Sequence, residues 1–314
     1  IDLPSGVETD SGALLSAVPH FGLCIALGAL KPAHLLYPAA GCFDRLIYAP
    51  IDIPAPDQVH RLEPPRLMAP GADAHKYTRG LVAVVGGSMS GAARLAARSA
   101  AVSGAGMVRL FGMDQAVAGP DAIIHQQMAT AADVAKALDD DRIAVVLVGP
   151  GLGRDAVARD RLAAVVGAGH RLVLDADALT LLAVDAIPKG AILTPHEGEF
   201  RRLFGDLPGS KIDRARAAAA QCGAVVIYKG ADSVIAAPDG RVAVAAGAST
   251  WLSTAGTGDV LAGLVAVRLA VTGDPFRAAS EAVWLHGDAA RRAGAAFVAD
   301  DLPDALPAAI ASRL

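Results

Sequence analysis

Short runs of apolar, mostly β-branched residues alternate with Ala-rich stretches from residue 81 onward. Uninterrupted apolar runs of this length indicate strands that are buried on both faces. The Ala-rich stretches AARLAARSAAVSG, DRLAAVVGAG and DRARAAAAQCG end in glycine, which is typical of a helix C-terminus. Strand followed by helix, repeated, predicts an α/β fold with a mostly parallel sheet. The expected strands cover residues 81–87, 107–112, 143–151, 171–177, 191–197 and 224–230.

A hairpin is expected near the end of this pattern. Residues 233–238 and 241–247 are apolar and are joined by Asp239 and Gly240, a typical hairpin turn pair. The hairpin follows Lys229, which ends an apolar strand, although a surface lysine is an equally open interpretation at this point. Ligands gather at the carboxyl ends of the strands in such sheets, so the polar residues there are candidates for chemistry.

The segment TAGTGDVLAG, residues 254–263, carries the most specific chemical signal. Gly256, Thr257, Gly258 and Asp259 stand directly before an apolar, helix-like run over 260–270. The free N–H groups and the positive dipole end of a helix start can hold a phosphate or a developing negative charge. Asp259 beside such an anion hole could accept a proton from an attacking hydroxyl. An ordinary Gly-rich turn remains the alternative for this motif alone.

Further polar groups follow other expected strands. Asp175 and Asp177 end one strand, where they would orient a ligand or a metal, or cap a helix. His196 ends the next strand and precedes Glu197 and Glu199, which are also the acidic residues expected in a first helical turn. The Gly-rich turn within residues 85–106 is no Walker loop, because the required Lys-Ser or Lys-Thr pair is missing. Taken singly, each of these motifs allows both a structural and a ligand-binding interpretation.

Composition narrows the class of protein. The 314 residues are 53% hydrophobic and 19% charged, which describes a compact folded chain. A net charge of -4 with scattered basic residues predicts no nucleic-acid partner. Cys24, Cys42 and Cys222 fit neither a disulfide framework nor a zinc site, and they favour a reducing cytoplasm. We find no apolar run of the ~18 residues that a membrane span needs, and we expect no membrane partner.

A change of composition indicates two unequal parts. Prolines are dense and apolar periodicity is lost between residues 54 and 74. We therefore expect a short N-terminal part over 1–54, a linker over 55–74 and a large domain over 75–314. Since the chain opens with Ile1 and shows no basic leader, it is expected to be a fragment or a processed product without a signal peptide.

Six motifs, taken in order, resemble the ADP/ATP-dependent NAD(P)H-hydrate dehydratases of the ribokinase-like superfamily. The match spans roughly residues 75–295, and the ordered set is specific where no single motif would be. The resemblance implies a ribokinase-like three-layer fold with helices on both faces of a mostly parallel central sheet. The motifs are HKYTRGLVAVVGGSMSGAA, GPGLG, LDADAL, TPHEGEF, KGADS and TAGTGDVLAG.

The resemblance also implies a reaction. Its substrates would be (6S)-NADHX and NADPHX, in which water has added across a double bond of the reduced nicotinamide ring. ADP or ATP, with Mg²⁺, would phosphorylate the ring hydroxyl, and loss of phosphate would restore NADH or NADPH. Phosphorylation helps because hydroxide is a poor leaving group and phosphate a good one. A ribokinase-like kinase of another small alcohol, such as a vitamin precursor, is the alternative, and a nucleotide-binding module without turnover is a third interpretation.

The resemblance assigns roles to single residues. Asp259 is the base, and Gly256, Thr257 and Gly258 form the anion hole. Glu199 is expected to organise Mg²⁺ through water, because this place in many ribokinase-like enzymes carries an Asn-x-x-Glu pattern. The residues implied for the nucleotide are Lys229, Gly230, Ala231, Asp232, Ser233 and Gly258, and those for the hydrated substrate are Ala92, Gly151, His196 and Asp259.

The N-terminal part resembles the end of an NAD(P)HX epimerase domain. The resemblance rests on IDLPSGVETDSG, LGALKPAHLLYP and IYAPIDIP. Asp2 would correspond to a substrate-contacting aspartate and Ser5 to a potassium ligand. Since most of that domain is missing, we expect no epimerase activity and no working potassium site. Members of the dehydratase family often form homo-oligomers, tetramers among them, and we expect the same here.

Overall fold

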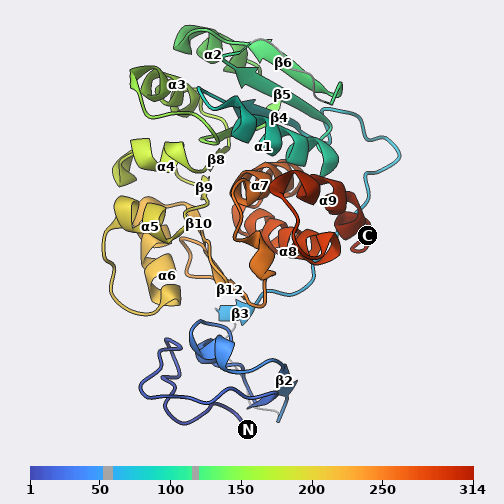
Figure 1. Ribbon diagram of the computed structural model, residues 1–314. Helices are drawn as coiled ribbons and strands as arrows, with labels where there is room; N and C mark the ends of the chain where they lie inside the picture. The colour runs from blue at the N-terminus through green and yellow to red at the C-terminus, as the bar shows by residue number, and fades with distance from the viewer. Residues whose placement is uncertain (52–58, 115–119) are drawn as a thin grey trace.

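A ten-stranded sheet forms the centre of the computed structural model, which describes residues 1–51, 59–114 and 120–314 (Figure 1). The strand order is β3-β12-β11-β10-β9-β8-β7-β4-β5-β6. All neighbours are parallel except β10–β11 and β11–β12, which confirms the predicted mostly parallel sheet. The strands are β3 (Val59–Arg61), β4 (Leu81–Val85), β5 (Met107–Gly112), β6 (Ile123–Gln127), β7 (Ile143–Val148), β8 (Leu172–Leu174), β9 (Ile192–Leu193), β10 (Val225–Tyr228), β11 (Ser233–Ala236) and β12 (Val242–Ala245).

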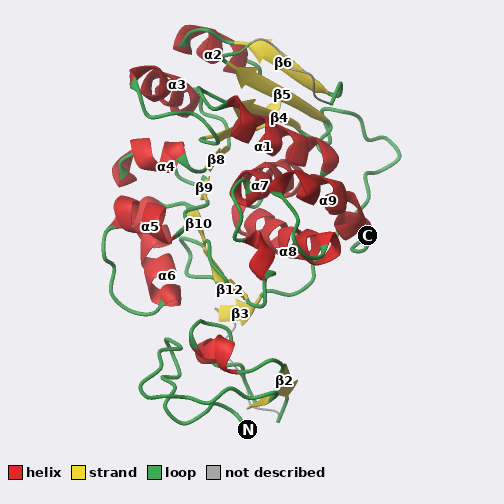
Figure 2. Cartoon of the chain, viewed as in Figure 1, coloured by secondary structure: helices red, strands yellow, loops and turns green. Residues whose placement is uncertain are grey.

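Helices cover both faces of the sheet (Figure 2). One layer contains α1 (Ser90–Val102), α7 (Thr257–Thr272), α8 (Pro275–Ala293) and α9 (Leu302–Ala311). The other layer contains α2 (Ala131–Leu138), α3 (Ala156–Gly167), α4 (Asp177–Leu181), α5 (Glu197–Phe204) and α6 (Lys211–Cys222). Short 3₁₀ turns complete the chain: η1 (Pro32–His34), η2 (Ala39–Cys42), η3 (Val184–Ala186), η4 (Thr250–Leu252) and η5 (Ala299–Asp301). The predicted three-layer α/β architecture is confirmed.

The central strands are apolar on both faces, and each face of the sheet therefore has its own hydrophobic core. Alternate side chains of a strand point to opposite faces, so Val82 and Val84 of β4 pack under the α1–α7–α8–α9 layer. Leu81, Ala83 and Val85 of the same strand pack on the other side. Because both faces are covered, β4 is apolar throughout, as the sequence pattern predicts.

The expected hairpin is present, but two edge strands were not predicted. β11 and β12 pair antiparallel from Ser233–Ala245 to Ala236–Val242. β6 has the sequence IIHQQ and lies at one edge, where a mixed apolar and polar pattern suffices. β3 lies at the other edge and pairs parallel with β12.

Part of the stretch expected to be a linker is therefore built into the sheet. Residues 55–58 of that prediction lie outside the described residues, but residues 59–61 form β3. Leu67 is buried, and its N–H donates to the carbonyl oxygen of Arg313 at 2.9 Å. The prolines interrupt the apolar periodicity, but this part of the chain still packs on the domain. Without β3, β12 would be the edge strand and its outer backbone groups would be unpaired, so β3 can pair with it. The domain boundaries themselves stay predictions.

The N-terminal segment, residues 1–51, lies at the β3 end of the sheet (Figure 1). It contains a two-stranded parallel sheet of β1 (Cys24–Leu27) and β2 (Leu46–Ala49). Leu35 and Leu36 of this segment are buried in the core that contains α6 and the hairpin. Cys24, Cys42 and Cys222 are free and buried. Across the described ranges, no helix combines the length and the apolar character needed to cross a bilayer.

Candidate active site

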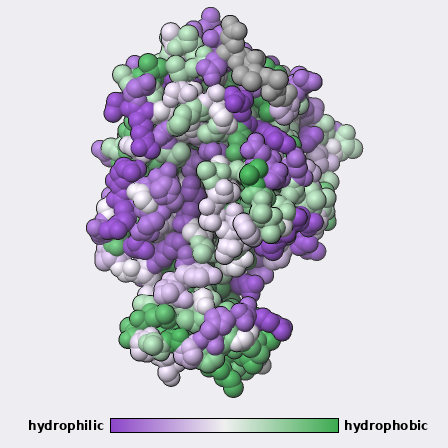
Figure 3. All heavy atoms as spheres, in the orientation of Figure 1, coloured by the Kyte–Doolittle hydropathy of each residue, from purple (hydrophilic) through white to green (hydrophobic). Residues whose placement is uncertain are grey.

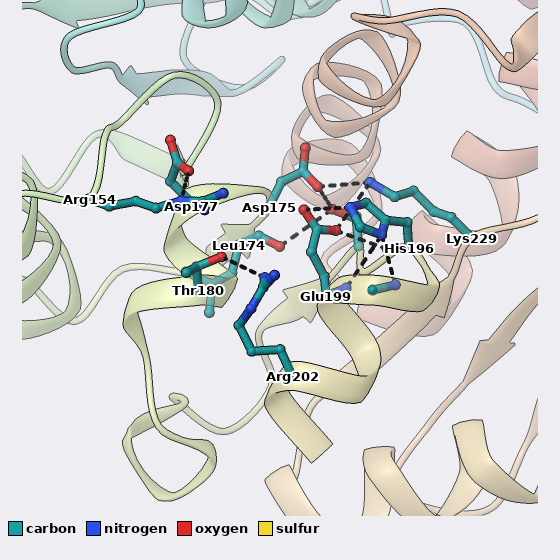
Figure 4. A network of polar contacts seen from close by, with 11 residues as sticks. Arg154, Leu174, Asp175, Asp177, Thr180, His196, Glu199, Arg202 and Lys229 are labelled. Carbon is teal, nitrogen blue, oxygen red and sulfur yellow. Dashed lines mark hydrogen bonds and ion pairs between the residues drawn. The ribbon is translucent and has the colours of Figure 1, made fainter. Parts of the chain in front are cut away.

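Three polar side chains meet at the carboxyl edge of the sheet (Figure 4). Asp175 follows β8, His196 follows β9 after Thr194 and Pro195, and Lys229 follows β10. These strands are parallel neighbours, so their carboxyl ends share one edge and their last residues converge. The expectation that the strand-end residues gather in one place is met for these three.

Lys229 and Asp175 form the centre of this cluster, in which Asp175 is buried and Lys229 is half-buried. Lys229 Nζ donates to Asp175 Oδ1 at 3.1 Å and lies 3.9 Å from Glu199 Oε2. Thr194 Oγ1 donates to the same Asp175 oxygen at 2.5 Å. Burial alone lowers the pKa of Lys229, but the charges of Asp175, Glu199 and Asp259 outweigh it and raise the pKa above its ordinary value. Lys229 therefore stays charged among carboxylates.

The start of α7 lies beside this lysine. A Cβ placed on Gly258 would stand 3.3 Å from Lys229 Nζ. Gly256 precedes the helix with a φ of 91°, and within the described residues no side chain caps the helix start by a hydrogen bond. The Thr257 hydroxyl donates to the carbonyl oxygens of Leu252 and Thr254, at 2.9 and 3.0 Å. The N–H groups of this turn and the positive dipole end thus remain available to an anion, with an ammonium group alongside.

Asp259 lies in the first turn of α7 and is partly buried. Its pKa is raised to about 7, first by burial and then by the negative charge of Asp175, while Lys229 lowers it. A base whose pKa lies near the working pH combines the right protonation state with a useful driving force. Its position in the first turn of α7, next to the uncapped helix start, is compatible with the predicted role in proton removal.

His196 has a structural role that the sequence did not reveal. It is the N-cap of α5, where its Nδ1 accepts from the backbone N–H of Gly198 at 3.0 Å. The backbone N–H of His196 donates in turn to Glu199 Oε2 at 2.9 Å, and the two hydrogen bonds together form a capping box. The imidazole is still 59% exposed, so a ligand can reach it. The predicted substrate contact is compatible with this cap and stays a prediction.

Glu199 is buried between His196 and Lys229. Within the described residues, no group of three or more His, Cys, Asp or Glu side chains is arranged to hold a metal directly. Carboxylate oxygens nevertheless suit Mg²⁺, which usually keeps several of its waters. Asp175, Glu199 and Asp259 offer such oxygens, so the donor set fits a metal bound partly through water, and the role of Glu199 in holding it stays a prediction.

The 229–233 loop, with the sequence KGADS, lies next to the start of α7 through Lys229. Gly230 and Ala231 are exposed, while Asp232 is buried. The backbone N–H of Gly230 donates to Ser233 Oγ at 3.1 Å, which holds the loop as a tight turn. Lys229 thus brings the start of this loop next to Gly258, while Asp232 lies buried beneath it.

Ala92 and Gly151 belong to two loops that touch. Ala92 lies in the first turn of α1, after β4, and Gly151 follows β7 with a φ of 62°. The N–H of Met89 donates to the Gly151 carbonyl oxygen at 3.0 Å, and a Cβ on Gly151 would stand 2.0 Å from Met89 O. A Cβ on Gly149 would stand 1.7 Å from the carbonyl oxygen of Asp175, which joins these loops to the cluster. Their predicted substrate contacts stay untested.

Asp177 and Arg161 position these loops. Asp177 accepts from the N–H of Gly153 at 2.9 Å and from Arg154 Nε at 2.7 Å, so both of its carboxylate oxygens hold the loop after β7. Arg161 is fully buried and donates to the carbonyl oxygens of Gly86, Phe111 and Met128. An arginine within a helical pattern is expected to be exposed to solvent. The sequence therefore did not predict that Arg161 holds the carbonyl oxygens of these loops.

Ser5 and Asp2, the residues implied by the epimerase resemblance, lie in the N-terminal segment. Ser5 is exposed. Asp2 Oδ1 accepts from Lys31 Nζ at 2.6 Å, and Asp2 lies 3.9 Å from His34. Both residues belong to the N-terminal segment, which lies beyond β3 in Figure 1.

This fold and this site define a ribokinase-like protein. A ribokinase-like superfamily protein from Enterococcus faecalis V583 is 25% identical and superposes with a TM-score of 0.71, over 79% of this chain and 92% of that one. The model of the NAD(P)H-hydrate dehydratase family matches residues 82–311. The chain therefore belongs to the NAD(P)H-hydrate dehydratase family.

Individual relatives agree with this family. The structure of an ADP/ATP-dependent NAD(P)H-hydrate dehydratase from Bacillus subtilis, crystallised with ATP/Mg²⁺, is 30% identical with a TM-score of 0.67, over 79% of this chain and 95% of that one. A bifunctional NAD(P)H-hydrate repair enzyme from Mycobacterium leprae is 36% identical over all of this chain and 66% of its own length. The corresponding Mycobacterium tuberculosis enzyme is 35% identical over 86% of this chain and 58% of its own length. The chain thus spans less than two thirds of these curated relatives.

Proposed function

We propose that this chain catalyses the ADP- or ATP-dependent dehydration of (6S)-NADHX and NADPHX to NADH and NADPH. One observation carries the proposal: Asp259, with a pKa of about 7, stands at the uncapped start of α7 beside the Lys229 ammonium group. A hydroxyl base, an anion hole and a cation are the parts that transfer of a phosphoryl group to an alcohol requires. Family membership selects the alcohol, the hydroxyl of the hydrated nicotinamide ring.

The steps follow from the positions of these groups. The ring hydroxyl gives its proton to Asp259 while its oxygen forms a bond to the terminal phosphorus of the nucleotide. The bond from that phosphorus to the bridging oxygen breaks, and the shortened nucleotide leaves with the electron pair. The N–H groups of residues 256–258 and Lys229 stabilise the charge on the transferred phosphoryl group. The ring carbon–oxygen bond then breaks, phosphate leaves, and the adjacent carbon loses a proton to restore the double bond.

Mg²⁺ fits this scheme through the carboxylates of Asp175, Glu199 and Asp259. When bound, the ion would neutralise charge on the nucleotide phosphates. Glu199 would hold it through water, His196 would contact the substrate from its exposed face, and Ala92 and Gly151 would line the substrate side. The 229–233 loop would hold the nucleotide.

We also propose a cytoplasmic homo-oligomer, tetrameric as in many family members, without nucleic-acid or membrane partners. Three free buried cysteines are typical of a reducing compartment. Exposed apolar side chains gather on the N-terminal segment, at the bottom of Figure 3, and include Leu15, Ile47 and Tyr48. Such a patch favours an interface. Light scattering of the purified chain measures the assembly, and a monomer would contradict this part of the proposal.

The reaction is tested by mixing the purified chain with (6S)-NADHX, Mg²⁺ and either ADP or ATP, and by following both reduced-nicotinamide absorbance and free phosphate. We expect both signals to rise together, only with nucleotide present, and to be lost in an Asp259→Asn variant. Nucleotide turnover that leaves a stable phosphorylated alcohol would instead show a kinase of another substrate.

A further inference from the structure

The 229–233 loop is held from two opposite ends. Lys229 at its start is bound to Asp175 in the site. Asp232 near its end is buried, and both of its carboxylate oxygens are engaged. Oδ1 accepts from Lys211 Nζ at 2.6 Å, and Oδ2 accepts from the backbone N–H of Tyr37 at 2.8 Å. The second partner comes from the N-terminal segment, 195 residues away in the sequence.

The lysine in this arrangement also shapes the loop. Lys211 Nζ lies 3.4 Å from the carbonyl oxygen of Lys229 and 4.9 Å from the centre of the Tyr228 ring. A Cβ on Gly230 would stand 2.4 Å from the same Nζ atom. Lys211 therefore packs under the turn, and Asp232 is the carboxylate that compensates its charge.

The N-terminal segment is anchored where it meets the loop. Leu36, next to Tyr37, is fully buried and belongs to the same core as Tyr228, Val234 and Ala236. These three residues come from β10 and β11, the two strands that the loop connects. Tyr37 as a whole is 46% exposed, and its link to Asp232 runs through its backbone N–H, which the buried Leu36 anchors.

We propose that the N-terminal segment is a positioning element for nucleotide binding: Leu36 and the Tyr37 N–H, acting through Asp232, keep the 229–233 loop in the shape that receives the nucleotide phosphates. The inference rests on the proposed nucleotide site. A loop that adopts its binding shape only part of the time binds more weakly by that fraction. The segment thus couples the part of the chain that resembles an epimerase to the nucleotide affinity of the dehydratase.

The test uses the full chain and two variants that act on different ends of this link. Leu36→Ala removes the anchor without touching the loop. Asp232→Asn leaves one oxygen to serve two donors, so either the Tyr37 N–H or Lys211 loses its acceptor. Leu138→Ala, at a buried position of the same core in α2, is the matched control for general loss of packing. Calorimetry measures the Kd of ADP–Mg²⁺ and ATP–Mg²⁺, and steady-state rates give KM for nucleotide and for NADHX.

We expect Leu36→Ala and Asp232→Asn to raise the nucleotide Kd and KM roughly tenfold, the effect of a loop that is correctly shaped a tenth of the time. The KM for NADHX and the constants of Leu138→Ala should not change. Unchanged nucleotide Kd values in both variants overturn the inference, as does an equal effect of Leu138→Ala. If Leu36→Ala does not fold, the milder Leu36→Val takes its place, because Asp232→Asn alone does not separate the Tyr37 link from the Lys211 link. A wild-type chain that binds neither nucleotide overturns the proposed nucleotide site itself, which separates the two failures.

Discussion

The ammonium nitrogen of Lys229 lies 3.1 Å from Oδ1 of Asp175, in the cluster that also acts on Asp259. Asp175 raises the pKa of Asp259 through its charge, and Lys229 lowers it. The two members of the pair thus act on Asp259 in opposite directions, and burial is the largest cause of its raised pKa. Changing one member of the pair should change the acidity of Asp259 without touching it.

Lys229→Met tests this balance. With the cation removed, Asp175 and Glu199 act on Asp259 without compensation, so its pKa should rise above about 7 and the rising limb of the pH–rate profile should move to higher pH. Breaking a buried pair by removing one partner costs about 3–5 kcal/mol of folding stability. The double variant Lys229→Met/Asp175→Asn should restore part of the folding stability and return the pH–rate profile part of the way to that of wild type. A profile of Lys229→Met that coincides with wild type would contradict the coupling.

The pH dependence of the wild-type rate follows from the same carboxyl. Asp259 must be ionised to accept a proton, and its pKa is about 7. Below that pH, kcat/KM should therefore fall about tenfold per pH unit. Rates measured with saturating nucleotide across pH 5 to 9 check this, and a flat profile below neutrality would remove Asp259 from the proton transfer.

Folding stability should show the opposite dependence on pH. The pKa of Asp259 is higher in the folded chain, about 7, than its ordinary value of 3.8, so the folded state binds the proton more tightly than the unfolded state. Asp259 contributes its full stabilisation of the fold below the unfolded pKa of 3.8, and this contribution is lost as pH rises through the folded pKa of about 7. In that range the free energy of unfolding falls by at most about 1.4 kcal/mol per pH unit because of this group. Asp259→Asn should thus be more stable than wild type at pH 8, with the gap closing at pH 4. Urea unfolding at the two pH values measures this, and a gap that widens toward acid would contradict it.

Gly256→Ala tests the geometry of the helix start. The position has a φ of 91°, and a Cβ there would stand 2.8 Å from Ala299 Cβ. Gly240→Ala is the matched control, since its φ is 92° and none of the described atoms lies within 4 Å of a Cβ there. The control should lose about 1–2 kcal/mol from backbone conformation alone, and Gly256→Ala about 1–3 kcal/mol more from the steric contact. Only Gly256→Ala should also lose activity; equal losses of rate in both would argue against the anion hole.

Glu199→Gln separates the cap of α5 from the proposed magnesium role. The glutamine oxygen can still accept the His196 N–H, because Glu and Gln both complete a capping box. Stability should stay near wild type, while the Mg²⁺ concentration for half-maximal rate should rise severalfold. Titration of activity with Mg²⁺ measures this, and an unchanged magnesium dependence would refute the role of Glu199.

Sequence patterns predicted the sheet because its strands are buried on both faces and are therefore apolar without interruption, as in β4 and β7. They did not predict β3, because its three residues VHR show no strand pattern of their own and are defined as a strand by their pairing with β12. The candidate site was likewise predicted where local patterns mark it and missed where it depends on distant contacts. Asp259, Lys229 and His196 stand at strand or helix ends that the pattern marks, whereas the hydrogen bond from Tyr37 to Asp232 depends on tertiary contacts that local sequence does not contain.

The pairing of β3 with β12 bears on how this protein can be divided for study. A fragment that begins at residue 75 would lack β3 and leave unpaired those backbone donors and acceptors of β12 that face β3. Such an edge is a template for strand addition from another molecule, and it promotes aggregation. A shortened version that keeps the chain from residue 59 onward retains its own protective strand and should stay dispersed at concentrations where the shorter one precipitates.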